Sequence, residues 1–334
     1  MHSKVEIKLV SSEIATLWTT YISDSMAVCV FKHFLSNVQD SEIRPVIEFA
    51  LSLAQKHIQI ISDTFNKEGL TIPIGFTDED VNVSAPRLFS DAYYLYYLRL
   101  MGTLGLEAYS VAIPFMVRQD VLDFFTDCLQ TTLELARRVS ATLLSKGLFI
   151  RPPFIEITKD IDFVKKQSFL AGLFGEHRNL LSIEVTHLYA NLESNVDFRT
   201  LLTGFAQVSN SSVIKDYMIR GKHIAEKHIE MITSTLKTDD VSAPTTWDNF
   251  ISDSATSPFS DKLMLFHVNL LSIARFGTYA TGLAASLRSD LQVEYFRLIA
   301  EIAKFASDGG RIMIDNGWLE QPPQAINHEV LSKV

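Results

Sequence analysis

Apolar side chains recur every three or four positions along most of this chain, which is the spacing of one face of an α-helix. In the second half, for example, Leu181, Val185 and Leu188 continue into Leu192 and Val196. Eight such stretches predict eight helices, which begin near residues 12, 41, 90, 119, 181, 213, 261 and 289. Paired prolines follow the fourth and the eighth stretch and end each set of four. The pattern predicts an all-α protein.

The two halves of the chain carry the same features at a nearly constant separation. At 170 positions the matching segments are Phe89-Ser90-Asp91 with Phe259-Ser260-Asp261, and Arg118-x-Asp120 with Arg288-x-Asp290. Further upstream the separation is 171, as in Glu13 with Glu184 and His57 with His228. A repeat of this length is a whole domain copied once. We expect a first bundle over residues 1–150, a connector over 151–178 and a second bundle over 179–334.

The lengths of the intervening segments indicate how each set of four helices is connected. Only a few residues separate the first helix from the second, and the third from the fourth, so each pair is expected to be an antiparallel hairpin. About 20 residues lie between the second and third helices in both halves, and Pro73 and Pro244, with Phe76 and Trp247, predict that this crossover is ordered. Two hairpins joined by one long crossover form the ferritin-like arrangement. We expect two tandem ferritin-like four-helix bundles, packed around a pseudo-two-fold axis as in an ancestral homodimer.

Charge and composition exclude several classes of function. The formal net charge is −9 and the isoelectric point is about 5.5, and an acidic chain without basic clusters is poorly suited to binding nucleic acid. No apolar run is expected to reach the roughly 18 residues of a transmembrane segment, and the N-terminus does not resemble a signal peptide. The two cysteines, Cys29 and Cys128, have no counterparts in the second half. Their number and placement are typical of a cytoplasmic protein.

Several runs of residues resemble a known family. They include Lys166-Gln167-Ser168-Phe169-Leu170, Ser257-Pro258-Phe259-Ser260-Asp261 and Asn316-Gly317-Trp318-Leu319. With these runs the chain resembles domain-of-unknown-function family 3231 over almost its whole length. The resemblance implies tandem ferritin-like bundles, an origin in Gram-positive spore-formers and no established activity. A looser similarity to ferritin-like spore-coat proteins implies an association with spores.

Ferritin-like bundles that bind iron or manganese place glutamates and histidines in the bundle core. The second half offers four candidate ligands on three predicted helices: Glu184, His187, His228 and His267. They predict one site for iron or manganese in the second bundle. The first half has Thr16 in place of His187 and Tyr97 in place of His267, so no metal site is expected there. Buried histidines that fix the packing of the helices are the alternative interpretation.

Polar residues that occur in both halves suggest structural contacts. We expect Glu13 to form a hydrogen bond with His57 across the core, and Glu184 to do so with His228, with proton transfer as an alternative role. Asp91 follows a serine N-cap, where a carboxylate stabilises the start of a helix. Arg118-x-Asp120 predicts a salt bridge in the tight turn before the fourth helix, with anion binding as the alternative.

Three hypotheses about function follow. The first is a structural or interaction protein without enzymatic activity, because the chain contains no complete ligand set and no recognised catalytic motif. The second is a metal-binding protein with its site in the second bundle, and the third is a bundle that holds a small apolar ligand between its helices. We expect protein partners or a homodimer. The apolar segment of the connector, residues 169–175, is expected to pack against the bundles or in a dimer interface.

Overall fold

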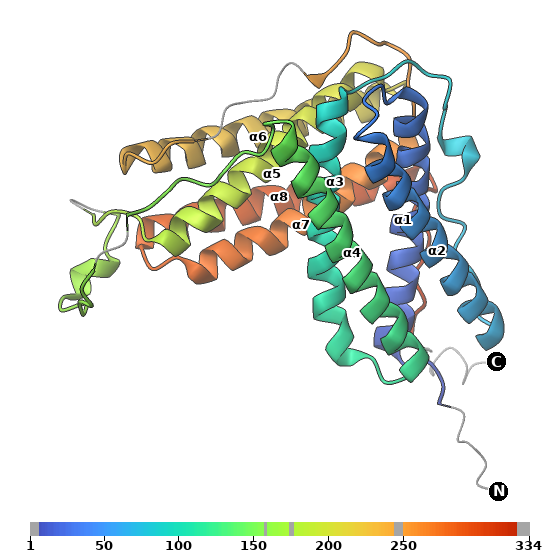
Figure 1. Cartoon of the computed structure of the whole chain (residues 1–334), viewed down its shortest axis with the longest axis horizontal. Coiled ribbons are helices and arrows are strands. Elements are labelled where there is room, and N and C mark those ends of the chain that lie inside the picture. Colours follow the sequence, from blue (N-terminus) through green and yellow to red (C-terminus); the bar gives the residue numbers. More distant parts are fainter. Residues whose placement is uncertain (1–6, 157–158, 174–176, 244–249, 326–334) are drawn as a thin grey trace, which may run out of the picture.

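The computed structural model describes residues 7–156, 159–173, 177–243 and 250–325, which contain eight α-helices in two sets of four (Figure 1). The first set is α1 (Ser11–Asn37), α2 (Arg44–Glu68), α3 (Asp91–Ala112) and α4 (Gln119–Ser145). The second set is α5 (Ser182–Val208), α6 (Ser212–Thr238), α7 (Asp261–Ala285) and α8 (Ser289–Asp315). The predicted starts agree within one residue, except that α2 begins three residues later, after a turn in which Asp40 accepts a hydrogen bond from the Glu42 N–H. The predicted all-α fold is confirmed.

Side chains and glycines at the helix ends explain several of these boundaries. Ser260 Oγ accepts a hydrogen bond from the N–H of Leu263 at 3.1 Å, which is the usual N-cap contact. Ser90 has the same role at the start of α3. Gly147 and Gly317 follow α4 and α8 with a φ of +67°, a left-handed conformation that glycine adopts without strain.

The aspartates that follow the two serine caps connect different parts of each bundle. Asp91 and Asp261 lie in the first turn of α3 and α7, as predicted. Their carboxylates, however, accept hydrogen bonds from the loop between the first two helices of the same bundle. Asp91 accepts from the Asp40 N–H at 2.7 Å, and Asp261 accepts from the Ser211 N–H at 2.9 Å. Each aspartate therefore ties the third helix to the first hairpin.

In each set, two antiparallel hairpins pack side by side. In the second bundle α5 packs on α6 and α7 on α8, and the contacts of α5 with α7 and of α6 with α8 close the bundle. Residues 69–90 and 239–260 form the long crossovers, and the prediction of two ferritin-like four-helix bundles is confirmed. Phe76 of the first crossover is buried, whereas Pro244 and Trp247 lie outside the described residues.

The two crossovers meet between the bundles, and we call this contact, residues 80–90 with 250–260, the seam. Four backbone hydrogen bonds form it: Asn82 N to Pro258 O (2.8 Å), Ser252 N to Leu88 O (2.9 Å), Ser260 N to Asp80 O (3.0 Å) and Ser90 N to Phe250 O (2.8 Å). The second bond repeats the first, and the fourth repeats the third, with the two halves exchanged. The halves are therefore related by a pseudo-two-fold axis through the seam, as predicted. Figure 1 shows the two bundles pointing in different directions from this region.

The connector has two parts with different surroundings. Phe154, Ile161 and Phe163 in the first part are 90%, 90% and 78% exposed. In the second part, the guanidinium carbon of Arg178 lies 4.3 Å from the centre of the Phe169 ring. A Cβ atom on Gly172 would collide with the Asp290 side chain, so the backbone there lies directly against α8. The described residues of this second part, 169–173, pack on the second bundle, as predicted, whereas residues 174–175 lie outside the described residues. The first part exposes aromatic side chains.

Helix α1 is long and apolar enough, by length and composition alone, to cross a membrane, contrary to the expectation from the sequence. In this structure it packs against α2 in the first bundle. Core helices of bundles have the same composition, because most of their surface is covered by neighbouring helices.

Candidate functional site

Glu184, the first of the predicted metal ligands, lies at the end of the second bundle rather than at its centre. Arg178 donates two hydrogen bonds of 2.8 Å to its carboxylate, one to each oxygen. The N–H groups of Leu181, Leu287 and Arg288 also donate to it, at 2.9, 3.0 and 3.2 Å. Burial raises the pKa of Glu184, but these hydrogen bonds outweigh burial and the pKa is lowered. This carboxylate holds the α7–α8 turn on the start of α5.

The same arrangement occurs at the end of the first bundle. Glu13 is fully buried and accepts hydrogen bonds from the N–H groups of Val117 and Arg118 at 2.8 and 2.7 Å. Arg118 pairs with Asp120 at 2.6 Å and with Glu68 at 2.5 Å, so the predicted salt bridge is confirmed. Arg288 repeats these contacts with Asp290 at 2.7 Å and Asp239 at 2.8 Å. These two clusters of charges fix the ends of the bundles.

His228 lies in the core of the second bundle and is part of a chain of hydrogen bonds. Its Nδ1 lies 2.9 Å from the Tyr279 hydroxyl, and its Nε2 lies 3.1 Å from Glu301 Oε2. The Asn195 amide donates to the same hydroxyl at 2.8 Å. A neutral imidazole with its proton on Nε2 satisfies every one of these contacts. Burial lowers the pKa of His228 to about 4, although Glu301 acts in the opposite direction.

The predicted Glu–His hydrogen bonds across the core are not formed. His57 Nδ1 instead lies 2.9 Å from Asp24 Oδ2, and burial raises the pKa of Asp24. The reason is the register of the hairpin: Asp24 lies fourteen residues before Val38 and His57 lies fourteen after Ile43, so the two face each other across the turn. Glu13 is eleven residues further from that turn.

The remaining two candidates lie apart from these sites. His187 is half-buried on α5 and has no hydrogen bond to another described residue. His267 is fully buried on α7, with Nε2 3.1 Å from the hydroxyl of Tyr97 on α3. Among the described residues, no three His, Cys, Asp or Glu side chains are grouped so that they could hold a metal ion. The structure therefore does not bring together Glu184, His187, His228 and His267, the set that was predicted to bind iron or manganese.

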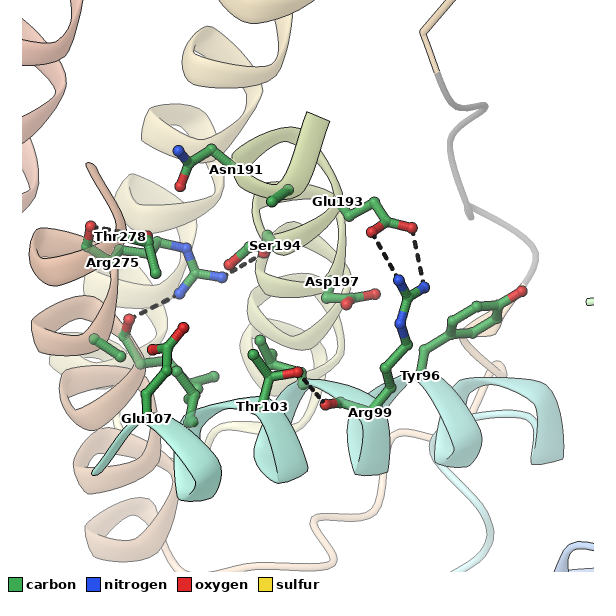
Figure 2. Close-up of a pocket in the computed structure, with 15 residues that line it drawn as sticks. Tyr96, Arg99, Thr103, Glu107, Asn191, Glu193, Ser194, Asp197, Arg275 and Thr278 are labelled. Carbon is green, nitrogen blue, oxygen red and sulfur yellow. Dashed lines mark hydrogen bonds and ion pairs between the residues drawn. The ribbon is translucent and has the colours of Figure 1, made fainter. Parts of the chain in front are cut away.

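A cavity of about 210 Å³ lies where α3 of the first bundle meets α5 and α7 of the second (Figure 2). We call it the junction cavity. Five charged residues line it: Arg99, Glu107, Glu193, Asp197 and Arg275. Figure 2 shows Arg99, Thr103 and Glu107 along α3, with Arg275 reaching from α7 towards Ser194 on α5. Thr103 and Glu107 are exposed, so the cavity is accessible from solvent.

The two arginines of the junction cavity are already engaged. Arg99 forms a two-bond ion pair with Glu193, with distances of 3.1 and 3.2 Å. Arg275 is 2% exposed and donates to the carbonyl oxygens of Leu271, at 2.9 Å, and Ser194. Its guanidinium also lies 3.7 Å from the centre of the Phe198 ring. Burial lowers the pKa of Arg275 to about 10, and its Nε atom has no partner among the described residues.

Asp197 is a partly buried acid of the junction cavity. Its carboxylate has no hydrogen bond to another described residue. Burial, with Glu193 as the second cause, raises its pKa to about 7. Burial also raises the pKa of Glu107. The junction cavity therefore contains an acid whose charge changes close to neutral pH.

The sequence comparison between the halves overlooked these residues because it selected features that the two copies share. At 170 or 171 positions, none of the five charged residues has a charged counterpart. The counterparts are Asn269 for Arg99, Gly277 for Glu107, Ile22 for Glu193, Met26 for Asp197 and Gly105 for Arg275. A search for charges unique to one copy would have found all five. Their common location depends on the way the bundles pack, which sequence spacing does not reveal.

The chain was also compared with known proteins. A solved structure from Bacillus halodurans, described as a "putative spore coat protein", is 18% identical and covers 46% of this chain and 98% of its own, with a TM-score of 0.41. No protein with a curated description is significantly similar in sequence. The model of the family described as "Protein of unknown function (DUF3231)" matches residues 2–161 and again residues 168–331. The chain therefore belongs to this DUF3231 family and contains its domain twice.

Proposed function

We propose that this protein is a structural or interaction protein rather than an enzyme, and that its two bundles act as one unit. The observation that carries the proposal is the reciprocal seam, in which each crossover donates to and accepts from the other. This reciprocal contact joins the two bundles in the way that an isologous interface joins the subunits of a symmetric dimer. In addition, the buried Glu13, Glu184 and His228 are bonded to neighbouring groups of the protein, which leaves them poorly placed for catalysis.

The isolated second half, residues 179–334, tests the role of the seam. Without the first half, it would expose Phe205, Phe259 and His267, all of which are buried in the full chain. We expect this fragment to be helical by circular dichroism and to dimerise through that surface in sedimentation experiments. A matched fragment with Phe205→Glu should remain monomeric. A well-folded monomer of the unsubstituted fragment would contradict the proposal.

The exposed part of the connector is the surface that we propose for contact with a second copy of this chain. Phe154, Ile161 and Phe163 expose most of their side chains, and exposed apolar groups of this size are typical of interaction sites. The full chain should self-associate with increasing concentration, and a Phe154→Ser/Phe163→Ser variant should do so more weakly. If the two proteins sediment identically as monomers, a different protein must be sought as the partner.

We place the protein in the cytoplasm, where it would be associated with spores. The cytoplasmic location is supported by Cys29 and Cys128, which are both buried and free. The association with spores rests on the sequence resemblance to ferritin-like spore-coat proteins. Immunodetection in purified spores and in vegetative cells of the source organism tests this part, and a protein confined to vegetative cells would overturn it.

A further inference from the structure

We propose that the junction cavity binds a small organic ammonium ion that also carries a hydroxyl group, as in an amino alcohol. This inference goes beyond the structural role of the two bundles and concerns a site that they form together. It is derived from the groups that line the cavity and that lack partners among the described residues.

The charges available in the cavity favour a cation. Arg99 and Glu193 neutralise each other. Arg275 keeps its positive charge, which acts on Asp197, so Arg275, Asp197 and Glu107 together leave the cavity with one net negative charge when both acids are ionised. The carboxylates of Asp197 and Glu107 then remain without a hydrogen-bonding or ion-pair partner among the described side chains. This net negative charge attracts an ammonium group and repels an anion.

Two buried polar atoms indicate which further groups the ligand carries. Asn191 Oδ1 and Arg275 Nε both belong to residues that are 2% exposed, and neither atom has a partner among the described residues. Leaving a buried polar atom without a hydrogen bond is unfavourable, so such an atom normally forms one with a ligand or a water molecule. An ammonium group can donate to Asn191 Oδ1 as well as to a carboxylate. Arg275 Nε–H can donate to the oxygen of a hydroxyl group on the same ligand.

The size of the cavity limits the ligand to a small molecule. A water molecule takes about 30 Å³ in the liquid, so a cavity of about 210 Å³ has the volume of about seven waters. The side chains of Leu100, Leu104 and Leu271 also line it and would cover a short carbon chain. A bare metal ion is a poorer match, because no three His, Cys, Asp or Glu residues of the described part of the chain are grouped as ligands.

The first copy of the domain shows which residue can replace Asp197 in the same bundle position. The position of Asp197 is occupied in the first copy by Met26, which is fully buried. An apolar side chain is therefore compatible with this position in the bundle. The fold of the first copy forms without a carboxylate at this position, and burying a carboxylate is unfavourable unless a cation compensates its charge.

Binding should depend on pH because the ligand needs the ionised form of Asp197. The charged and titratable groups around it are Glu193 on its own helix, Arg99, Glu107, Tyr93 and Tyr96 on α3, and Arg275 on α7. Burial raises the pKa of Asp197 to about 7. Above pH 7 the affinity should level off for as long as the amine itself stays protonated, and below pH 7 it should fall up to tenfold for each pH unit.

Calorimetric titration of the full chain at pH 8 tests the proposal with amino alcohols of two to six carbons, beginning with ethanolamine. Diols and hydroxy acids of the same lengths serve as neutral and anionic comparisons. We expect one amino alcohol to bind in a 1:1 complex, with at least tenfold weaker binding of its diol and hydroxy-acid analogues. At pH 6 the affinity should fall about tenfold.

Two substitutions and one control complete the experiment. Asp197→Asn should weaken binding at least tenfold and remove the pH dependence, while its melting temperature equals or exceeds that of the unsubstituted protein. Glu107→Gln alters an exposed side chain, so its circular dichroism spectrum should match that of the unsubstituted protein, and it should weaken binding severalfold. Asp216→Asn, on the exposed face of α6, should change nothing. Absence of binding by every amino alcohol, preference for hydroxy acids, or unchanged affinity in both cavity variants would overturn the proposal.

Discussion

Tyr97 and His267 occupy the same position in the two copies of the domain, 170 residues apart, and they contact each other: the Tyr97 hydroxyl lies 3.1 Å from His267 Nε2. A residue that meets its own counterpart lies on the pseudo-two-fold axis. The surrounding rings follow the same symmetry, with Phe34 5.3 Å from Tyr97 and Phe205 5.8 Å from His267. In a symmetric dimer this position would pair two identical side chains. The fused chain allows two different ones.

The first prediction concerns the hydroxyl group of Tyr97. Tyr97→Phe leaves Nε2 of the fully buried His267 without its partner, which should lower the free energy of unfolding by about 1–3 kcal/mol. Tyr94→Phe is a matched control on the same helix, because the Tyr94 hydroxyl is buried and has no partner among the described residues. Its removal should be neutral or stabilising. Urea denaturation of both variants measures the difference, and equal effects would contradict the role assigned to the hydrogen bond.

The second prediction concerns the close contact between α5 and the first crossover. A Cβ atom on Gly204 would lie 2.5 Å from Cζ of the buried Phe89 ring, so Gly204→Ala should destabilise the protein by about 1–3 kcal/mol through overpacking. Gly310→Ala is the control, since nothing lies within 4 Å of the added atom. There, the higher helix propensity of alanine should stabilise by up to about 1 kcal/mol. The melting temperatures of both variants, measured by circular dichroism, test this prediction. A Gly204→Ala protein as stable as the parent would show that Phe89 does not pack as described.

The third prediction concerns what two buried histidines contribute to stability in mild acid. Burial lowers the pKa of His267 to about 3, and that of His33 to about 4. The unfolded chain, with a histidine pKa of about 6.5, therefore binds protons that the folded chain does not bind as the pH falls below that value. The stabilisation is fully present above pH 6.5 and decreases as the pH falls towards the folded-state values.

A variant isolates the contribution of one histidine to this effect. Between pH 7 and pH 5, His267 should account for a loss of about 2 kcal/mol, at about 1.4 kcal/mol per pH unit. The free energy of unfolding of His267→Gln should accordingly fall by about 2 kcal/mol less than that of the parent over this range. Identical pH dependence of the two proteins would mean that His267 becomes protonated in the folded state.

The fourth prediction concerns metal content. Both oxygens of Glu184 and both nitrogens of His228 are engaged in hydrogen bonds, and a metal ion would have to displace these partners. We expect metal well below one ion per chain by plasma mass spectrometry, in protein purified without a nickel column. The His228→Ala and His267→Ala variants should give the same result. One or two ions of iron, manganese or zinc per chain, lost in the variants, would restore the metal-binding hypothesis.

Much of the architecture could be predicted because it depends on local sequence. Helical spacing, serine caps and C-terminal glycines act within a few residues of each helix end. Ser260 marks the start of α7, and Gly317 marks the end of α8. The site was harder to predict. His228 was correctly expected in the core, but its partners Tyr279 and Glu301 come from two other helices, and their identity depends on the register of packing.

The sequence by itself determined that this protein consists of two copies of one four-helix domain, because periodicity and repetition are properties of the chain. Only the tertiary structure decided which polar groups meet. Hairpin register brought His57 to Asp24 instead of Glu13, and the pseudo-two-fold packing placed Arg99 on α3 beside Glu193 on α5. Such contacts depend on distances between helices that are remote in sequence, and these distances are fixed when the apolar faces pack together.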